Sequence, residues 1–241
     1  MWCHYSQLQV NVHKCFILHL GDTNNRFIYG FNGITIPSTE LIKDLGVYID
    51  PSLSFNEHIL ITCSKARARC AIYFKTFVSR DIYSMKLFFI TYVRPLLEFA
   101  SPIWNPILIS QINAIESVQR YFTNKIPTCS FLPYKRRLEV LNLDSLLKRR
   151  NIADLVFVFS LFNGSTNCSL YPYLELAIPS ITRGHDLRIL RPVFNLARSH
   201  QNIISRVCPT WNTLPMALLA SQSNLIFRNK LLSFCQDPFR K

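Results

Sequence analysis

The sequence predicts an α+β fold, mainly α, in which a small N-terminal antiparallel β-sheet precedes a larger helical part. A change of pattern along the chain supports this prediction. Up to about Pro51, short apolar runs alternate with turn residues, and beyond it apolar residues recur at steps of three and four, the spacing of a helix face. The chain has 241 residues, of which 49% are hydrophobic, so it can bury a sizeable core.

Apolar runs over residues 14–20, 26–29, 34–36 and 43–50 are expected to be the strands of this sheet. The second and third runs lie on either side of Asn32 and Gly33. Both of these residues tolerate positive φ, which makes the pair a strong local signal for a hairpin. An irregular meander is the alternative, but the hairpin signal favours a small antiparallel sheet.

The first predicted helix covers residues 56–78. Ser54 and Glu57 form an S-x-x-E capping box in front of it. One apolar stripe runs along this helix, and its spacing is typical of a face packed on a core. The stripe consists of Ile59, Cys63, Ala66, Cys70, Tyr73 and Phe77.

Further helices are predicted over residues 84–93, 110–123 and 224–234, and from a cap at Asp144 to Phe162. The first of these should be interrupted at Pro95, since proline has no amide hydrogen to donate to the preceding turn. Asn163 and Gly164 form a common stop signal after Phe162. Residues 165–179 look like a loop, so we expect domains over 1–53, 54–164 and 165–241.

The charge of the chain is lopsided, with 27 Lys and Arg against 14 Asp and Glu and a formal net charge of +13. This excess indicates an acidic partner, and nucleic acid and an anionic membrane surface fit it equally well. A membrane-spanning helix needs roughly 20 consecutive apolar residues, and none is found, so we expect no transmembrane segment.

The scattered cysteines indicate an intracellular protein, nuclear or cytoplasmic. None of the 8 cysteines belongs to a C-x-x-C pair, so free thiols in a reducing compartment are favoured over zinc or disulfides. The first ten residues lack the basic start and long apolar run of a secretory signal.

The motifs of common active sites are absent from the sequence. There is no Asp-Asp pair, no D-x-D or E-x-E spacing for two metal ions, and no G-x-S-x-G, H-E-x-x-H or phosphate-binding glycine loop. We therefore expect no catalytic residues, no metal site and no cofactor in this chain, although distant residues can still converge in a fold.

Basic residues without acids close by in the sequence are the candidate contacts to phosphate groups. Clusters on successive helices can form a stripe that holds nucleic acid without sequence specificity, and such binding weakens strongly with salt. The candidates are Lys65, Arg67 and Arg69; Lys135, Arg136 and Arg137; and Lys148, Arg149 and Arg150, the last with Asp154 as a possible neutralising partner.

Two further arginines have an acid one helical turn away. Arg94 can contact phosphate, but an internal ion pair with Glu98 is favoured, because the segment around Trp104 is aromatic. Glu116 and Arg120 are expected to form a pair on a helix surface.

Several strings of this sequence, in order, resemble the C-terminal part of the reverse transcriptase of non-LTR (LINE-type, Jockey-like) retrotransposons. Each string is weak alone, but the ordered set spans almost the whole chain. The strings are NVHKC (11–15), KDLGVYID (43–50), LSFNEHI (53–59), YVRPLLEFASPIWNP (92–106), IESVQR (115–120) with Phe122-Thr123, Arg137-Leu138, LLKRR (146–150) and WNTLP (211–215).

The resemblance implies roles for these segments. Residues 11–20 would be the strand after the catalytic motif of the palm, where Lys14 approaches the incoming nucleotide. Residues 44–50 would be the primer-grip hairpin, and residues 54–150 the thumb and connector that hold the RNA–template duplex. The Tyr-x-Asp-Asp motif that binds Mg²⁺ in an intact family member is absent, so an upstream polymerase domain would be needed for activity.

Three functions therefore remain open. The first is a fragment of an RNA-directed DNA polymerase, inactive alone, that binds RNA or DNA weakly through basic helices. The second is a basic interaction module for a protein partner or an anionic membrane. The third is a non-functional remnant whose apolar surfaces once faced the missing palm.

Overall fold

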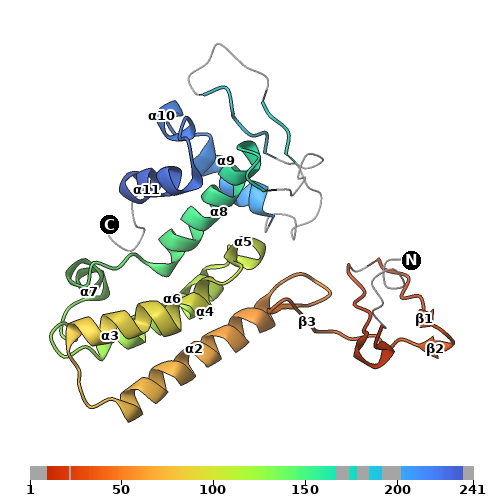
Figure 1. Ribbon diagram of the computed structural model, residues 1–241, viewed down its shortest axis with the longest axis horizontal. Coiled ribbons are helices and arrows are strands. Elements are labelled where there is room, and N and C mark those ends of the chain that lie inside the picture. The colour runs from red at the N-terminus through yellow and green to blue at the C-terminus, as the bar shows by residue number, and fades with distance from the viewer. Residues whose placement is uncertain (1–9, 22, 167–173, 178–184, 192–201, 236–241) are drawn as a thin grey trace. The chain divides into compact units, whose positions relative to one another are not determined.

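The structure is a computed structural model that describes residues 10–21, 23–166, 174–177, 185–191 and 202–235 (Figure 1). It consists of two compact units, Met1–His58 and Ile59–Lys241. The described part of the first unit carries short strands, and the second is built from helices, so the mainly α, α+β prediction is confirmed. The expected boundary in residues 165–179 lies partly outside the described residues.

The hairpin predicted at Asn32 and Gly33 is confirmed. Strand β1 (Gly30–Phe31) pairs antiparallel with β2 (Ile34–Thr35) across these two residues. Asn32 has φ 49° and Gly33 has φ 78°, so both occupy the left-handed region that a tight two-residue turn requires.

A second hairpin occupies the segment that follows. Strand β3 (Ile42–Asp44) pairs antiparallel with β4 (Val47–Ile49), so the expectation of one continuous strand over residues 43–50 is wrong. The turn is made by Leu45 at φ 44° and Gly46 at φ 98°. A leucine rarely adopts positive φ, so no local pattern predicts a turn at this position.

Residues 14–20 do not form the expected strand. They begin with the end of the 3₁₀ turn η1 (Val12–Lys14), and their sheet contact is an isolated parallel bridge between Ile17 and Ser38. The strands of the described residues therefore form two separate two-stranded sheets in place of a single sheet.

The carboxylate of Asp50 organises the turn that leads from β4 into helix α2 (Asn56–Thr76). It accepts hydrogen bonds from the amides of Ser52 (2.9 Å), Ser54 (3.1 Å) and Phe55 (2.9 Å) and from the hydroxyls of both serines. Burial raises the pKa of Asp50, but the hydrogen bonds together outweigh burial and leave this pKa below its usual value. The predicted cap, Ser54, accepts from the Asn56 amide at 3.3 Å.

Helix α2 presents its predicted apolar stripe to the core of the second unit. Ile59, Cys63, Ala66, Cys70 and Tyr73 are buried, whereas Phe77, at the end of the stripe, is 51% exposed. Aromatic rings fill the far end of this interface. They belong to Tyr73 and Phe74 of α2, Phe88 and Phe89, and Phe122.

The expected interruption at Pro95 is wrong, because the helix changes its geometry and continues. Helix α3 (Ile82–Phe88) passes into the π-helix η2 (Phe89–Val93) and then into α4 (Arg94–Glu98). The amide of Arg94 donates to the carbonyl of Phe89, five residues earlier. This wider turn accommodates a proline that would clash with the carbonyl of an ordinary α-helix.

A short helix that was not predicted, α5 (Ser101–Trp104), lies in the aromatic segment around Trp104. The helix predicted over residues 110–123 is confirmed as α6 (Ile109–Asn124), and a further short helix, α7 (Tyr134–Val140), follows it. Helix α8 (Leu146–Phe162) begins after Ser145, whose hydroxyl accepts from the Lys148 amide at 3.1 Å, so Ser145 is the cap in place of the predicted Asp144. It ends at Asn163, and Gly164 has φ 64°, as the stop signal predicts.

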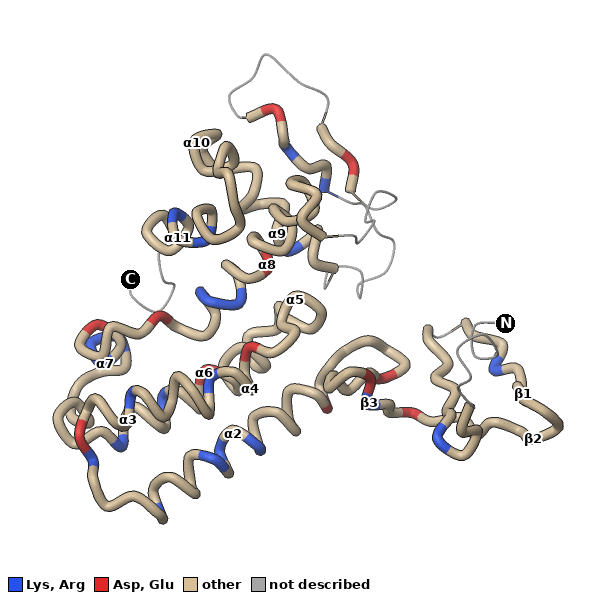
Figure 2. The backbone as a smooth tube through the Cα atoms, viewed as in Figure 1, with Lys and Arg blue, Asp and Glu red and all other residues tan. Residues whose placement is uncertain are grey.

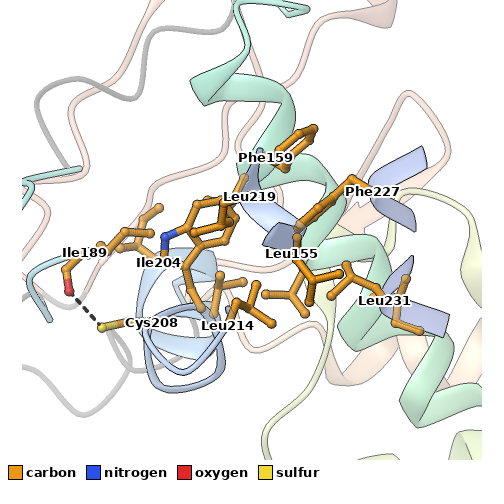
Figure 3. Packing of buried hydrophobic residues seen from close by; sticks show 14 residues of the cluster. Leu155, Phe159, Ile189, Ile204, Cys208, Leu214, Leu219, Phe227 and Leu231 are labelled. Atoms are coloured by element: carbon orange, nitrogen blue, oxygen red, sulfur yellow. Dashed lines mark hydrogen bonds between the residues drawn. The ribbon is translucent and has the colours of Figure 1, made fainter. Parts of the chain in front are cut away.

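The last helices pack on α8 around a second aromatic and aliphatic core (Figure 3). They are α9 (Ile203–Trp211), α10 (Met216–Leu219) and α11 (Asn224–Phe234), the last with the predicted bounds. The rings of Phe159 on α8 and Phe227 on α11 are stacked with centroids 4.0 Å apart. Described residues on both sides of residues 165–179 thus share one core, and the segments 59–164 and 165–241 lie in the same compact unit.

Asp50→Asn is expected to lower the free energy of unfolding near neutral pH. It should also make this free energy depend less on pH in the acid range. The native pKa lies below the unfolded value of about 3.9, so the carboxylate stabilises the fold above that pH and this contribution disappears as pH falls through the native pKa. Near neutral pH the loss should be about 1 kcal/mol, as for other capping carboxylates. Urea unfolding between about pH 3 and pH 7 measures both effects, with Asp44→Asn, an exposed acid of the same unit, as control. Parallel pH profiles for Asp50→Asn and the parent would contradict the assignment.

Candidate nucleic-acid interface

Some basic residues of the helical unit belong to a buried network of charged groups, and others lie exposed on its surface. Asp154, on α8, accepts from Arg206 Nε at 3.0 Å and from Asn105 Nδ2 at 2.8 Å. Arg206 also donates to the carbonyl of Pro102 at 2.8 Å, which links α9 to α5 as well as to α8. Burial raises the pKa of Asp154, and the charge of Arg206 opposes this shift.

Arg150 belongs to this interior and not to a surface stripe. It is fully buried, and its Nε donates to Asn105 Oδ1 at 3.0 Å. Burial lowers the pKa of Arg150, although Glu116, Glu98 and Asp154 favour its charged form. The charge of Asp154 thus acts on Arg150, but the direct ion-pair partner of Asp154 is Arg206.

The expected surface pair of Glu116 and Arg120 is wrong. Glu116 is fully buried and accepts from the Tyr134 hydroxyl and from the amides of Leu146 (3.4 Å) and Leu147 (3.3 Å), at the start of α8. Burial raises the pKa of this carboxyl, and the hydrogen bonds oppose the shift. Arg120 is half-buried, and its guanidinium lies over the ring of Tyr134, 5.0 Å from the ring centroid.

The cluster Lys65, Arg67 and Arg69 lies exposed on α2, as predicted. Arg67 donates to the hydroxyl of Ser117 at 2.7 Å, and Arg69 donates to the carbonyl of Tyr92 at 3.0 Å. Both acceptors are neutral, so these hydrogen bonds position the guanidinium groups without cancelling their charge. Lys75 adds an exposed cation in the last turn, while the one acid of α2, Glu57, lies in its first turn (Figure 2).

The second predicted cluster is divided between surface and interior. Arg136 is exposed but pairs with Glu139 at 2.7 Å, and Lys135 is half-buried. Arg137 is buried and donates to Asn124 Oδ1 at 2.7 Å, so it is a structural residue. Helical spacing brings Glu139 next to Arg136, and the expectation of no nearby acid is wrong for this residue.

The residues of the third predicted cluster form ion pairs and hydrogen bonds within the protein. Lys148 is 7% exposed and pairs with Asp144 at 3.0 Å, and it also donates to the carbonyl of Leu232. Arg149 donates to both carboxylate oxygens of Glu98, from Nε to Oε1 and from Nη2 to Oε2, the latter at 3.0 Å. Neither residue is a cation without nearby acids, and the predicted phosphate-contact stripe does not extend over the start of α8.

Arg94 forms the internal pair that was favoured for it, with Nε 4.0 Å from Glu98 Oε2. Its pKa is lowered by burial and by the neighbouring charge of Arg149, against the opposing effect of Glu98. Lys14 is exposed at the end of η1 in the first unit. Sequence reasoning overlooked Arg206, which lies alone among the neutral residues of α9, and Arg228, whose one charged neighbour in α11 is Lys230.

No group of three or more His, Cys, Asp or Glu side chains that could hold a metal ion occurs among the described residues. Within the same part of the chain, no helix is both long and apolar enough to cross a membrane. Buried thiols are poor nucleophiles here, since burial raises the pKa of Cys70 to about 12.

Comparisons with protein-family models, with curated proteins and with solved structures gave no match to this chain.

Asp154→Asn is expected to destabilise the helical unit by about 3–5 kcal/mol, because it leaves the buried guanidinium of Arg206 without its counter-charge. Glu139→Gln is the matched control. It removes one carboxylate from a pair whose arginine is 69% exposed, and it should cost about 1 kcal/mol or less. Chemical denaturation of both variants provides the comparison, and equal losses would show that the Asp154 pair is not a special constraint.

Proposed function

We propose that this chain is a C-terminal portion of a reverse transcriptase of the non-LTR retrotransposon type, which holds nucleic acid but does not polymerise alone. The ordered strings from residue 11 to residue 215 support the family. The single observation that carries the binding role is the set of exposed cations on α2, which are Lys65, Arg67, Arg69 and Lys75. There Arg67 and Arg69 are held by neutral acceptors and keep their charge available.

The physical basis of this role is counterion release. A cation that replaces a counterion on a phosphate gains affinity in proportion to the number of phosphates neutralised, and the gain falls as salt rises. Helix α2 is 21 residues long, and Lys65, Arg67, Arg69 and Lys75 lie from its middle to its last turn. Exposed cations spread along such a helix can contact several phosphates of a nucleic-acid backbone. Lys135, Arg136 and Lys14 remain secondary candidates, and Arg94, Arg137, Lys148 and Arg149 are better assigned to the protein's own ion pairs and hydrogen bonds.

Replacing Lys65, Arg67 and Arg69 together by Gln is expected to weaken binding to duplex RNA–DNA. The slope of log affinity against log salt should fall by about 2–3, since each lost phosphate contact removes roughly 0.9 from it. Filter binding at increasing salt measures this slope. A matched control replaces Arg26, Lys125 and Lys230 by Gln, which removes the same charge from exposed sites on other elements.

Equal effects of the two triple variants would show that binding follows net charge and not the particular cations of α2. Circular dichroism of both variants checks that the loss of the Ser117 and Tyr92 hydrogen bonds leaves the helices intact. Binding to anionic vesicles with no binding to nucleic acid would instead support an interaction module at a membrane surface.

The purified chain is expected not to incorporate deoxynucleotides on a primed RNA template with Mg²⁺. The described residues contain no cluster of acids that could hold the metal ions of such a reaction. A primer-extension assay with an active reverse transcriptase as positive control provides the test. Extension by the chain alone would overturn the proposal that it lacks catalysis.

A second candidate, a module for a protein partner, is favoured by one observation. Apolar side chains on α3 to α5 and on the π-helix between them are exposed, among them Tyr83 (75%), Tyr92 (56%) and Ile103 (57%). Exposed apolar surface of this kind is typical of contact with another protein. An upstream polymerase domain is the partner that the proposed family implies, and co-purification of the two segments would test it.

A further inference from the structure

A pocket of about 410 Å³ lies between α4, α5, α8 and α11 in the helical unit. Its size falls in the range of sites for small organic ligands. The side of the pocket formed by α8 is largely apolar, with Val156 and Phe157 half-buried in it. Leu232 of α11 adds to this apolar wall. The pocket therefore offers a surface on which a flat, weakly polar group can lie.

The polar side of the same pocket carries an excess of positive charge. Arg149 and Arg228 line it, Arg94 lies within 4.0 Å of Glu98, and Glu98 is the only acid among the lining residues. Among the lining residues, two guanidinium groups against one carboxylate leave an excess of one positive charge. Burial and the nearby charge of Arg149 lower the pKa of Arg94, and the charge of Arg228 acts in the same direction.

Arg228 is the cation of this group that is left for a ligand. Arg149 is held by Glu98 through two contacts, whereas Arg228 is exposed on α11 and has no hydrogen bond or ion pair among the described residues. A planar guanidinium next to a second one is suited to a phosphate group, which accepts hydrogen bonds from both.

A hydrogen-bond acceptor in the same wall also lacks a donor. Asn224 lines the pocket at the start of α11, and its Nδ2 donates to Ser165 Oγ at 3.1 Å. Its Oδ1 is buried and has no hydrogen-bond partner. A buried acceptor without a donor is costly, so a ligand that brings an N–H group to this atom gains affinity.

From these three features we propose that the pocket binds a nucleotide unit. Its phosphate lies against Arg228 and Arg149, its base lies on the apolar wall of α8, and an N–H of the base donates to Asn224 Oδ1 once this side chain turns toward the pocket. Two sources share this chemistry, a free nucleotide and the phosphorylated end of a strand. None of the cations of α2 lines this pocket, and binding in the pocket does not depend on the function proposed for those cations.

Titration calorimetry of the full chain with adenosine monophosphate, adenosine and inorganic phosphate tests the pocket. The monophosphate is expected to bind about tenfold or more tightly than either part, because only it contacts both walls. Arg228→Gln should weaken monophosphate binding by about tenfold, the expected loss of one charge-assisted contact. Lys230→Gln, which removes an exposed charge two residues along the same helix, should leave it unchanged.

Val156→Trp provides a second variant, since the larger side chain fills the pocket and should abolish binding while thermal unfolding confirms that the chain is folded. The proposal would be overturned if neither the monophosphate nor a 5′-phosphorylated oligonucleotide bound, if the monophosphate and phosphate bound with equal affinity and no oligonucleotide bound, or if Arg228→Gln and Lys230→Gln had equal effects. An oligonucleotide with a 5′-phosphate that binds in an Arg228-dependent way, while the free nucleotide binds no better than adenosine, would assign the pocket to strand ends.

The pocket and the α2 interface can fail independently. Arg228→Gln is expected to leave the salt slope for duplex binding within one phosphate contact of the parent, and the α2 triple variant is expected to retain binding of the monophosphate. A loss of duplex binding without a change in nucleotide binding therefore bears on α2 alone.

Discussion

The buried ion pair of Asp154 and Arg206 is the constraint on which the helical unit depends. Its two residues lie 52 positions apart, and the contacts of Arg206 with Pro102 and of Asp154 with Asn105 bring a third segment to the same place. Each charge costs several kcal/mol to bury alone, so helices α5, α8 and α9 are stable only where all of these groups meet.

The same requirement decides which basic residues remain for a polyanion. Arg137, Lys148, Arg150 and Arg206 are buried or nearly so, and they satisfy carboxylates, amides and carbonyls of the protein itself. On α2, Arg67 and Arg69 instead donate to neutral groups, the Ser117 hydroxyl and the Tyr92 carbonyl. The formal charge of +13 is therefore not a measure of the surface that nucleic acid meets, since part of it is used inside the fold.

Much of the helical architecture could be predicted, because the apolar residues of 109–124 and 224–234 repeat with the period of a helix and have clear ends. The Leu45-Gly46 turn and the continuation through Pro95 could not, since they depend on strained or unusual backbone that tertiary packing supports. The partners of the basic residues were predictable only at close spacing, as for Arg94 with Glu98. The pairing of Arg149 with Glu98 joins positions 51 apart, which no local pattern indicates.

The π-helical segment 89–93 determines the direction in which the side chains of the following helix, α4, point about the helix axis. An α-helix advances by about 100° per residue, so loss of one residue there would rotate Glu98 by roughly that angle about the axis. Glu98 would then turn away from Arg149 on α8, whereas Arg94 lies on the same helix as Glu98 and would rotate with it. Natural variation in the length of this segment should accordingly be rare, even though its individual side chains can vary in size.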